Sequence, residues 1–376
     1  MRKDQKFRIL MTGLTAIVVA SLLLSAGTIN AQDKRVAKSA TVSTVSSTVP
    51  NNGDINPYGV FAVPKTVGRL NRGSILVSNF NASNNFQGTG TTIVQISPTG
   101  NFSQFAQINP KALPGPCPGG VGLTTALVVL RSGWVIVGSL PTMDGMSDTA
   151  QAGCLIVLDS NGNVVETITD PQINGPWDMN VFDRTGQKGN HPSDAVLFVT
   201  NVLNGTVAGG GAIVNEGTVL RITLAVPPSS KPVVQSISVI GSGFSERTDP
   251  AALVIGPTGV ALSKNNKVLY VADSLNNRIA AIADPLSRQT SAGTGTTVSS
   301  GGSLNDPLGL TLAVNGDILT TNGNDGFLVV TKPNGAQSAT ILLDPAGAGV
   351  LFGLTAVPGQ GVYFVDDGTN TLDLLH

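Results

Sequence analysis

The sequence predicts an all-β fold, and three observations support that prediction. Val, Ile, Thr and Leu dominate the apolar runs, which is the composition of β-strands. The 45 Gly and 22 Pro residues are spread between these runs, where turns require them. No segment after residue 31 sustains a helical period of apolar residues. Hydrophobic residues make up 41% of the chain and charged residues 12%, which indicates a packed protein rather than a disordered one.

The N-terminus has the features of a secretory signal peptide, which does not belong to the fold. Arg2, Lys3, Lys6 and Arg8 precede an apolar run over residues 9–26, and small residues lead up to Ala31. We therefore assign residues 1–31 to a signal peptide and expect a secreted or periplasmic protein that has no membrane contact after cleavage. An uncleaved anchor is the alternative, because about 18 apolar residues can just span a bilayer.

The clearest internal repeat lies at residues 257–279. It reads Pro257-Thr-Gly-Val-Ala-Leu, then Val268-Leu-Tyr-Val-Ala-Asp-Ser274, then Asn276-Asn-Arg-Ile279. This unit resembles the NHL repeat in its Pro-x-Gly-Val opening, its central strand and its Asn-Asn-Arg-Ile segment. The resemblance implies a β-propeller, in which each repeat forms one blade.

Five further units keep the same frame in degenerate form, so we expect six blades of four antiparallel strands. Their openings begin at Pro57, Val121, Pro176, Pro307 and Phe352. The predicted blades cover approximately residues 56–115, 116–172, 173–245, 246–302, 303–346 and 347–376. A single closed β-domain of this length is reasonable, since about 345 of the 376 residues remain after signal removal.

The last unit ends after its third strand, so its outermost strand has to come from elsewhere. Residues 40–46 form an alternating β-branched run within the N-terminal segment 32–55. Pairing this run with the last blade would close the ring and remove an exposed sheet edge. A Ser/Thr-rich linker is the alternative interpretation.

Cys117 and Cys154 are the only cysteines, and they fit one disulfide in an oxidising compartment. Two separate buried thiols are the alternative.

Candidate ligand contacts lie where loops enter the first strands of the blades. The loops that join second to third strands share that face of a propeller, and they are long in the first three units, at residues 81–90, 141–153 and 204–217. Long loops carry function more often than minimal ones do, although these loops could equally be solvated connections. The candidate ligand-binding residues at this channel mouth are Asn56, Tyr58, Trp177, Asp178, Asn180 and Asp306, with Phe352 beside them.

Trp177 and Asp178 are the most distinctive of these candidates. Most units have Gly where Asp178 stands, and an aromatic ring beside a carboxylate can both stack on a ligand and accept its hydrogen bonds. A structural Asp that closes the top of the blade is the alternative.

Charge and histidine content limit the function. The net charge of −1, with no basic stripe, argues against nucleic acid as a partner. His191 and His376 are the only histidines, which disfavours His-based metal or nucleophilic sites. Propeller lyases that resemble this sequence use channel histidines that have no counterpart here.

Propellers of the gluconolactonase type also resemble the sequence, and they hold a divalent metal with Glu, Asn and Asp. Asn56, Asp178 and Asp306 could supply oxygen ligands to Ca²⁺. Those enzymes have a Glu ahead of the first blade, whereas the first Glu here is Glu166. We therefore expect a monomeric binding or interaction module for an extracytoplasmic protein, peptide or glycan, with no required cofactor. A Ca²⁺-dependent lactonase or esterase is the alternative.

Overall fold

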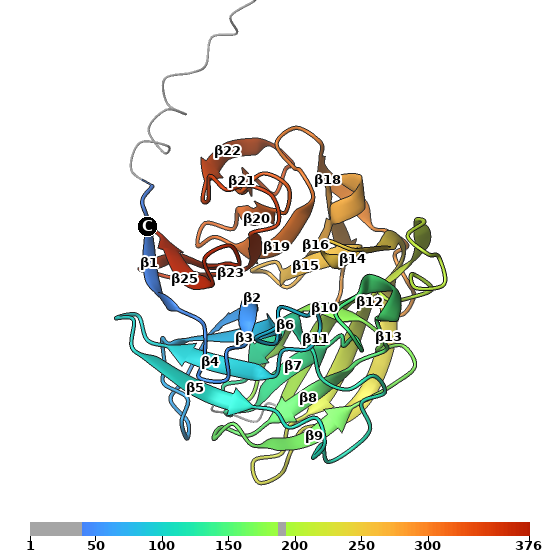
Figure 1. The fold of residues 1–376 in the computed structure, drawn as a ribbon. Coiled ribbons are helices and arrows are strands. Elements are labelled where there is room, and N and C mark those ends of the chain that lie inside the picture. The colour runs from blue at the N-terminus through green and yellow to red at the C-terminus, as the bar shows by residue number, and fades with distance from the viewer. Residues whose placement is uncertain (1–39, 187–192) are drawn as a thin grey trace, which may run out of the picture.

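The computed structural model describes residues 40–186 and 193–376, which form six antiparallel β-sheets (Figure 1). The expected signal peptide and His191 lie outside the described residues. Within the described ranges the only helical segments are two short 3₁₀ turns, η2 (Ser147–Thr149) and η3 (Ser274–Asn276). None of these elements has the length and hydropathy of a membrane-spanning helix.

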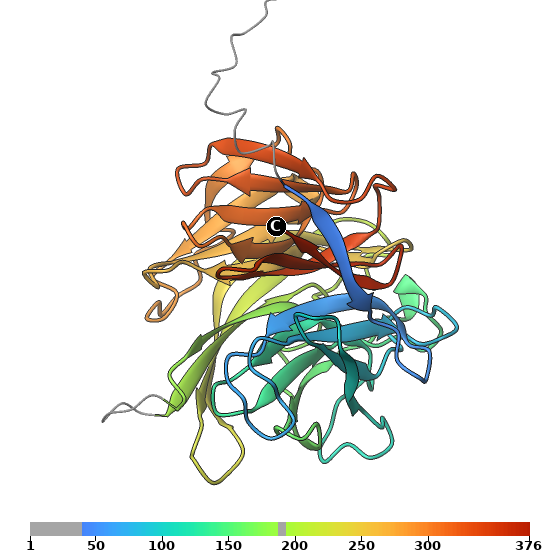
Figure 2. The same cartoon turned by 90° about the vertical axis from the view of Figure 1, so that its left-hand side faces the viewer.

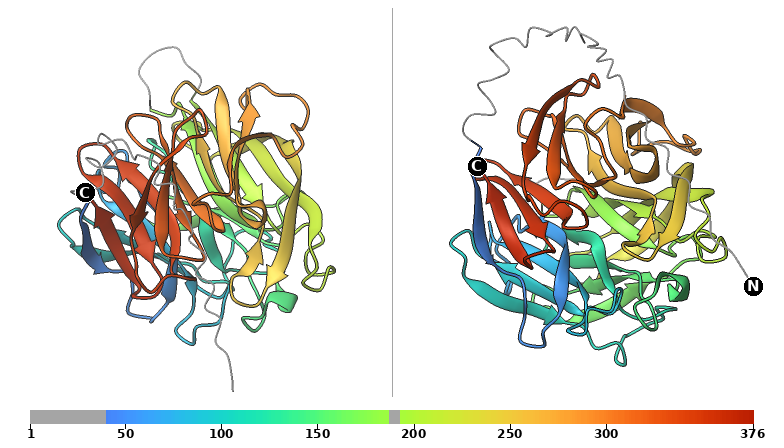
Figure 3. Two further views of the ribbon diagram at one scale, coloured as in Figure 1. Left: turned by 90° about the horizontal axis from the view of Figure 1, so that it is seen from above. Right: turned by 45° about the horizontal axis from the view of Figure 1, so that its top comes forward.

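The six sheets are the blades of a six-bladed β-propeller, as the repeat predicts (Figure 3). Blade 1 contains β2 (Ile55–Ala62), β3 (Ile75–Asn81), β4 (Thr92–Ile96) and β5 (Phe102–Gln107). Blade 2 contains β6 (Leu123–Val129), β7 (Val135–Ser139), β8 (Cys154–Leu158) and β9 (Val164–Ile168). Blade 3 contains β10 (Pro176–Asp183), β11 (Asp194–Asn201), β12 (Val214–Ala225), β13 (Val233–Asp249) and β14 (Leu253–Ile255).

The remaining blades are shorter and more regular. Blade 4 contains β15 (Pro257–Leu262), β16 (Val268–Asp273), β17 (Arg278–Ala283) and β18 (Thr296–Ser300). Blade 5 contains β19 (Pro307–Leu312), β20 (Ile318–Asn322), β21 (Phe327–Thr331) and β22 (Gln337–Leu342). Blade 6 contains β23 (Leu351–Val357), β24 (Gly361–Asp366), β25 (Thr371–Leu375) and β1 (Val42–Ser47).

The N-terminal strand completes the last blade, which confirms the predicted closure. β1 pairs antiparallel with β25, from Val42 opposite Leu375 to Ser47 opposite Thr371, so the first and last strands lie side by side (Figure 2). Beyond this pairing, the buried Thr48 hydroxyl donates to the Asn370 carbonyl at 2.9 Å. The N-terminal run is therefore part of the sheet rather than a linker.

The first strands of the blades surround the channel, and glycines allow their backbones to approach closely. A Cβ on Gly309 would lie 2.1 Å from the Phe352 carbonyl oxygen, and one on Gly353 would lie 2.2 Å from that of Tyr58. Such distances exclude any side chain without a backbone shift. The repeated Gly of the Pro-x-Gly-Val opening is therefore a requirement of blade-to-blade packing.

Buried hydroxyls on second strands connect neighbouring blades, and we call these contacts hydroxyl bridges. Each hydroxyl accepts from a backbone N–H of its own first strand and donates to a backbone carbonyl of the next blade's first strand. The bridges are Ser78 (Gly59 N, 3.0 Å; Thr124 O, 2.8 Å), Thr200 (Asp178 N, 3.1 Å; Thr258 O, 2.8 Å) and Thr321 (Gly309 N, 3.0 Å; Phe352 O, 2.8 Å).

Blade 3 is larger than the repeat predicts. The sequence pattern places residue 246 at the start of the fourth blade, but β13 continues to Asp249 and then turns back as β14. Residues 246–255 therefore extend blade 3, and blade 4 begins with β15. The repeat pattern does not reveal that residues 246–255 belong to blade 3. The Pro257 opening looks the same whether these residues end blade 3 or begin blade 4.

The loops sort onto two faces as the repeat predicts. The long-loop face carries the second-to-third connections, and these span residues 82–91, 140–153 and 202–213 in the first three blades. The opposite face carries the first-to-second and third-to-fourth connections. Two of these, 63–74 and 284–295, are also long.

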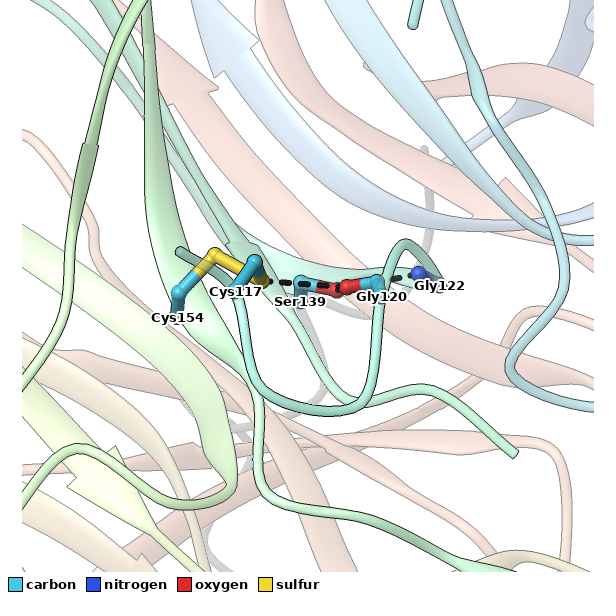
Figure 4. Close-up of a disulfide and its surroundings, with 5 residues drawn as sticks. All are labelled: Cys117, Gly120, Gly122, Ser139 and Cys154. Atoms are coloured by element: carbon cyan, nitrogen blue, oxygen red, sulfur yellow. Dashed lines mark hydrogen bonds between the residues drawn. A yellow bond between two sulfur atoms is a disulfide. The ribbon is translucent and has the colours of Figure 1, made fainter. Parts of the chain in front are cut away.

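The predicted disulfide is present and fixes a long loop to blade 2 (Figure 4). Cys117, in the connection 108–122, bonds to Cys154 at the start of β8, with their Cα atoms 5.2 Å apart. Next to it the Ser139 hydroxyl donates to the Gly120 carbonyl at 2.9 Å and accepts from the Gly122 N–H at 3.0 Å. The disulfide and these hydrogen bonds together hold the loop against blade 2.

Removing β1 should destabilise the entire ring, because blade 6 would lose its outer strand and expose the edge of β25. We expect a chain that begins at Val49 to melt at least about 5 °C below the chain that begins at Gln32. A synthetic peptide of residues 40–48 added in excess should restore the melting temperature, and a scrambled peptide should not. Equal melting temperatures for the two chains would show that β1 is dispensable.

Removing the disulfide should reduce the free energy of unfolding. For a bridge that spans 37 residues, the loop-entropy relation gives about 3–4 kcal/mol. We expect this loss in urea unfolding of the double variant Cys117→Ala/Cys154→Ala. The loop 108–122 should also become more sensitive to proteolysis. A change below about 0.5 kcal/mol would contradict the expectation.

Candidate functional site

An apolar plug closes the channel mouth on the long-loop face. The plug consists of Leu253 and Val254 of β14, which pack in one buried cluster with side chains from the surrounding first strands. Those side chains include Tyr58, Trp177 and Phe352, which are only 4%, 4% and 5% exposed. The space left beside them measures about 10 Å³, enough for roughly one water molecule.

The plug adopts an unusual backbone conformation. Leu253 has a φ of +63°, a region that bulky residues rarely occupy, and its side chain is fully buried. Pairing of β14 with β13, from Arg247 opposite Ile255 to Asp249 opposite Leu253, holds the turn in place. Burial of the leucine in the channel mouth offsets the backbone strain.

Trp177 and Asp178 both contact other parts of the protein: Trp177 packs against the plug, and Asp178 bonds the next blade. Trp177 lies under the plug, so a ligand could reach it only after Leu253 moved. Asp178 Oδ2 accepts from the Val260 N–H at 2.9 Å and so connects blade 3 to blade 4, at the position where blades 1, 4, 5 and 6 have a glycine. Burial raises the pKa of Asp178 to about 7. A ligand contact at this pair remains a prediction.

Asn180 and Asp306 lie in two other places. Asn180 Oδ1 accepts from the Leu262 N–H at 3.3 Å, and the residue lines a pocket on the opposite face. Asp306 has a left-handed backbone (φ +55°), and its N–H donates to Asn277 Oδ1 at 2.6 Å. Burial raises the pKa of Asp306 to about 6, and the negative charge of Asp249 is the second cause.

The three residues expected to bind Ca²⁺ have different hydrogen-bond partners. Asn56 bonds Asp367 and Asn81, Asp178 accepts from Val260, and the Asp306 backbone donates to Asn277. Among residues 40–186 and 193–376, no three His, Cys, Asp or Glu side chains are grouped to hold a metal ion.

Asn56 lines a polar pocket between blades 1 and 6 on the long-loop face, which we call the amide pocket. Tyr58 does not line it and lies instead in the apolar cluster at the plug. The volume of the amide pocket is about 360 Å³, and most of its wall consists of amide and carboxylate side chains. The polar side chains that line it are Asn56, Asn81, Asn85, Gln87, Asp367 and Asn370. They come from β2, from the end of β3 and its following loop, and from the turn between β24 and β25.

Hydrogen bonds order the amide pocket around Asn56. With its amide oriented so that both groups are satisfied, Asn56 Nδ2 donates to Asp367 Oδ1 at 2.9 Å and its Oδ1 accepts from Asn81 at 3.0 Å. The Asn56 backbone, at φ +61°, donates its N–H to Asn370 Oδ1 at 2.7 Å. Asn tolerates this left-handed conformation better than most residues do.

Burial shifts the acidity of two groups at this pocket. It raises the pKa of Asp367 to about 7, with the charge of Asp366 as the second cause. It also raises the pKa of Tyr58 well above its usual value, and the charge of Asp367 adds to that effect. The pocket therefore holds a carboxyl group that is about half protonated at neutral pH, and the Tyr58 phenol beside the pocket stays neutral.

Two acceptors at the pocket have no hydrogen-bond partner among the described residues. They are Asn81 Oδ1 and Gln87 Oε1, and both atoms are buried. A buried acceptor without a donor costs about 1–3 kcal/mol, so each favours the arrival of a donor from outside. Hydroxyl groups of a ligand or ordered water would serve.

Five of the polar residues that line the pocket were not among those expected from the sequence. Asn81, Asn85 and Gln87 lie in the long loop that was singled out, where the run Asn79-Phe-Asn-Ala-Ser-Asn-Asn85 is a compositional signal. Asp367 and Asn370 lie in the Asp-Asp-Gly-Thr-Asn turn of the last blade. No sequence signal connects this turn to residue 56, because only ring closure brings the two together.

Comparison with solved structures supports the fold. A protein assigned as a gluconolactonase matches with a TM-score of 0.55 at 15% identity, over 90% of this chain and 92% of its own. A gluconolactonase from Xanthomonas campestris matches with a TM-score of 0.54 at 12% identity, over 89% of each chain. A catalytically inactive virginiamycin B lyase from Staphylococcus aureus matches at 0.49 and 13% identity, over 90% of this chain and 99% of that one.

At these identities the likeness shows a shared six-bladed propeller and nothing finer. The sequence matches no protein-family model and no curated protein. Any function therefore has to be inferred from this chain's own residues.

The raised pKa of Asp178 predicts a pH-dependent stability. The folded protein keeps this proton up to about pH 7, whereas the unfolded chain releases it near the ordinary value of 3.8. Between these values the folded state binds more protons, so stability falls as the pH rises. Asp178→Asn keeps an acceptor for Val260 but cannot ionise, and its unfolding free energy should fall less steeply between pH 5 and pH 7. Identical slopes for both proteins in urea unfolding would contradict this assignment.

Proposed function

We propose that this protein is an exported, NHL-like binding propeller that holds a neutral polyhydroxylated ligand, the end of a glycan, in the amide pocket. The observation that carries the proposal is the chemistry of the pocket wall, where amide side chains and one partly protonated carboxyl surround a space of about 360 Å³. Sugar hydroxyls both donate and accept, and amide groups match them in both directions.

An exposed aromatic ring adds a second feature that suits a sugar. Phe86 is 47% exposed and lies in the chain between the pocket residues Asn85 and Gln87. Exposed aromatic rings can pack against the apolar face of a ring-shaped ligand. A peptide ligand would find few apolar side chains in the pocket, since Ile55 and Ala251 are the apolar residues that line it.

Several observations support the remaining parts of the proposal. The disulfide is consistent with an oxidising compartment outside the cytoplasm. The Pro257 unit, on which the NHL resemblance depends, forms the regular strands β15, β16 and β17.

A glycan array followed by calorimetry with the best-bound oligosaccharide tests the proposal. Asn81→Ala removes two pocket interactions and should weaken binding by about 1–3 kcal/mol, because a buried polar partner is lost. Phe86→Ala should also weaken it. Asn161→Ala, at an exposed turn of the opposite face, is the matched control and should leave the affinity unchanged. Absence of array binding, or equal affinities for Asn81→Ala and Asn161→Ala, would contradict the proposal.

A Ca²⁺-dependent lactonase or esterase is the second candidate. It is favoured by the fold likeness to gluconolactonases along nearly the full chain. The hydrogen bonds that Asn56 and Asp178 already make to other groups count against it. Saturable Ca²⁺ binding together with Ca²⁺-dependent lactone hydrolysis would favour this candidate over the binding module.

A further inference from the structure

The channel is open at the face opposite the plug. A pocket of about 420 Å³ lies there, at the carboxyl ends of four first strands. Phe61 of β2, Val129 of β6, Phe182 of β10 and Leu262 of β15 contribute its apolar wall. We call it the opposite-face pocket. It shares no lining residue with the amide pocket.

Aromatic rings give this pocket an apolar body. Phe61 and Phe182 are both half-buried, and each packs only partly against the cores between the blades. The Arg184 guanidinium lies 5.7 Å from the centre of the Phe182 ring and is ion-paired with Asp194. That pair holds the ring in position, and its charge is already neutralised.

Two cations from different blades flank the apolar wall. Arg131 lies in the turn after β6 and Lys264 in the turn after β15, and both are exposed. Neither side chain makes an ion pair or a hydrogen bond with any residue in 40–186 or 193–376. A third donor is Asn180 Nδ2, which lacks a partner in the same ranges, since Oδ1 is the atom that bonds Leu262.

Among the described residues, Asp183 is the one acid that lines this pocket, and both of its carboxylate oxygens accept backbone hydrogen bonds. Oδ2 accepts from the Arg131 N–H and Oδ1 from the Thr185 N–H, both at 2.7 Å. These bonds fix the Arg131 turn, and within residues 40–186 and 193–376 Asp183 forms no ion pair with either cation. With the charge of Asp183 counted, the described charged residues of the lining sum to one net positive charge.

We propose that the opposite-face pocket binds a small amphipathic anion, an aromatic or branched aliphatic carboxylate. The apolar portion would lie against Phe61 and Phe182, and the carboxylate would accept from Arg131, Lys264 and Asn180. An arginine and a lysine on separate turns suit a carboxylate, because charge-assisted hydrogen bonds are stronger than neutral ones. This inference does not depend on the amide pocket.

A matched pair of probes separates charge recognition from apolar binding. We would measure binding of 2-naphthoate and of its neutral isostere 2-naphthamide by calorimetry at pH 7 and low salt. The wild-type protein should bind 2-naphthoate at least tenfold more tightly than 2-naphthamide. Equal affinities, or no saturable binding of 2-naphthoate, would overturn the proposal.

Variants then assign the charge to named residues. Arg131→Gln/Lys264→Gln should weaken 2-naphthoate binding at least tenfold and leave 2-naphthamide binding unchanged. Lys267→Gln is the control, because Lys267 is exposed in the same turn as Lys264 but does not line the pocket. Phe182→Leu should weaken both probes alike. Equal 2-naphthoate affinities for the double variant and Lys267→Gln would overturn the proposal.

Discussion

The close contact of neighbouring first strands around the channel is the constraint on which the structure depends. Glycines remove the side chains that would keep these backbones apart, and the hydroxyl bridges of Ser78, Thr200 and Thr321 then connect one blade to the next. Each bridge satisfies buried backbone groups that no strand pairing reaches. Asp178 shows what happens where the glycine is replaced: its side chain itself crosses to the next blade.

This tight ring makes the two ends of the channel chemically different. At the long-loop end the extension of blade 3 places Leu253 in the opening, where it packs on large first-strand side chains. At the other end Phe61 and Phe182 line a pocket of about 420 Å³. The polar pocket on the long-loop face therefore lies away from the channel axis, at the junction between blades 1 and 6, where Asn56 bonds Asp367.

Repetition explains what the sequence could predict. The blades could be predicted because the Pro-x-Gly-Val opening recurs along the chain, and the closing strand because the last repeat lacks its fourth strand. The disulfide could be predicted because the chain has only two cysteines. The plug could not be predicted, because Leu253 is one apolar residue in an ordinary turn and only its φ of +63° and its burial reveal its role. The same limit applies to the amide pocket, since Asn56 and Asn370 meet across a separation of 314 residues that no local pattern encodes.

The closing pair of strands has a consequence for biogenesis. Thr48 and Asn370 are bonded across 322 residues, so a nascent chain can complete five blades but not the sixth. Closure is a contact of very long range, and such contacts form slowly. Until it forms, the edge of β25 and the free β1 segment are each able to pair with another copy of the chain. When many chains are synthesised close together, β1 can therefore pair with β25 of another molecule, which gives a domain-swapped dimer. A propeller whose last blade consisted of consecutive strands only would not have this route.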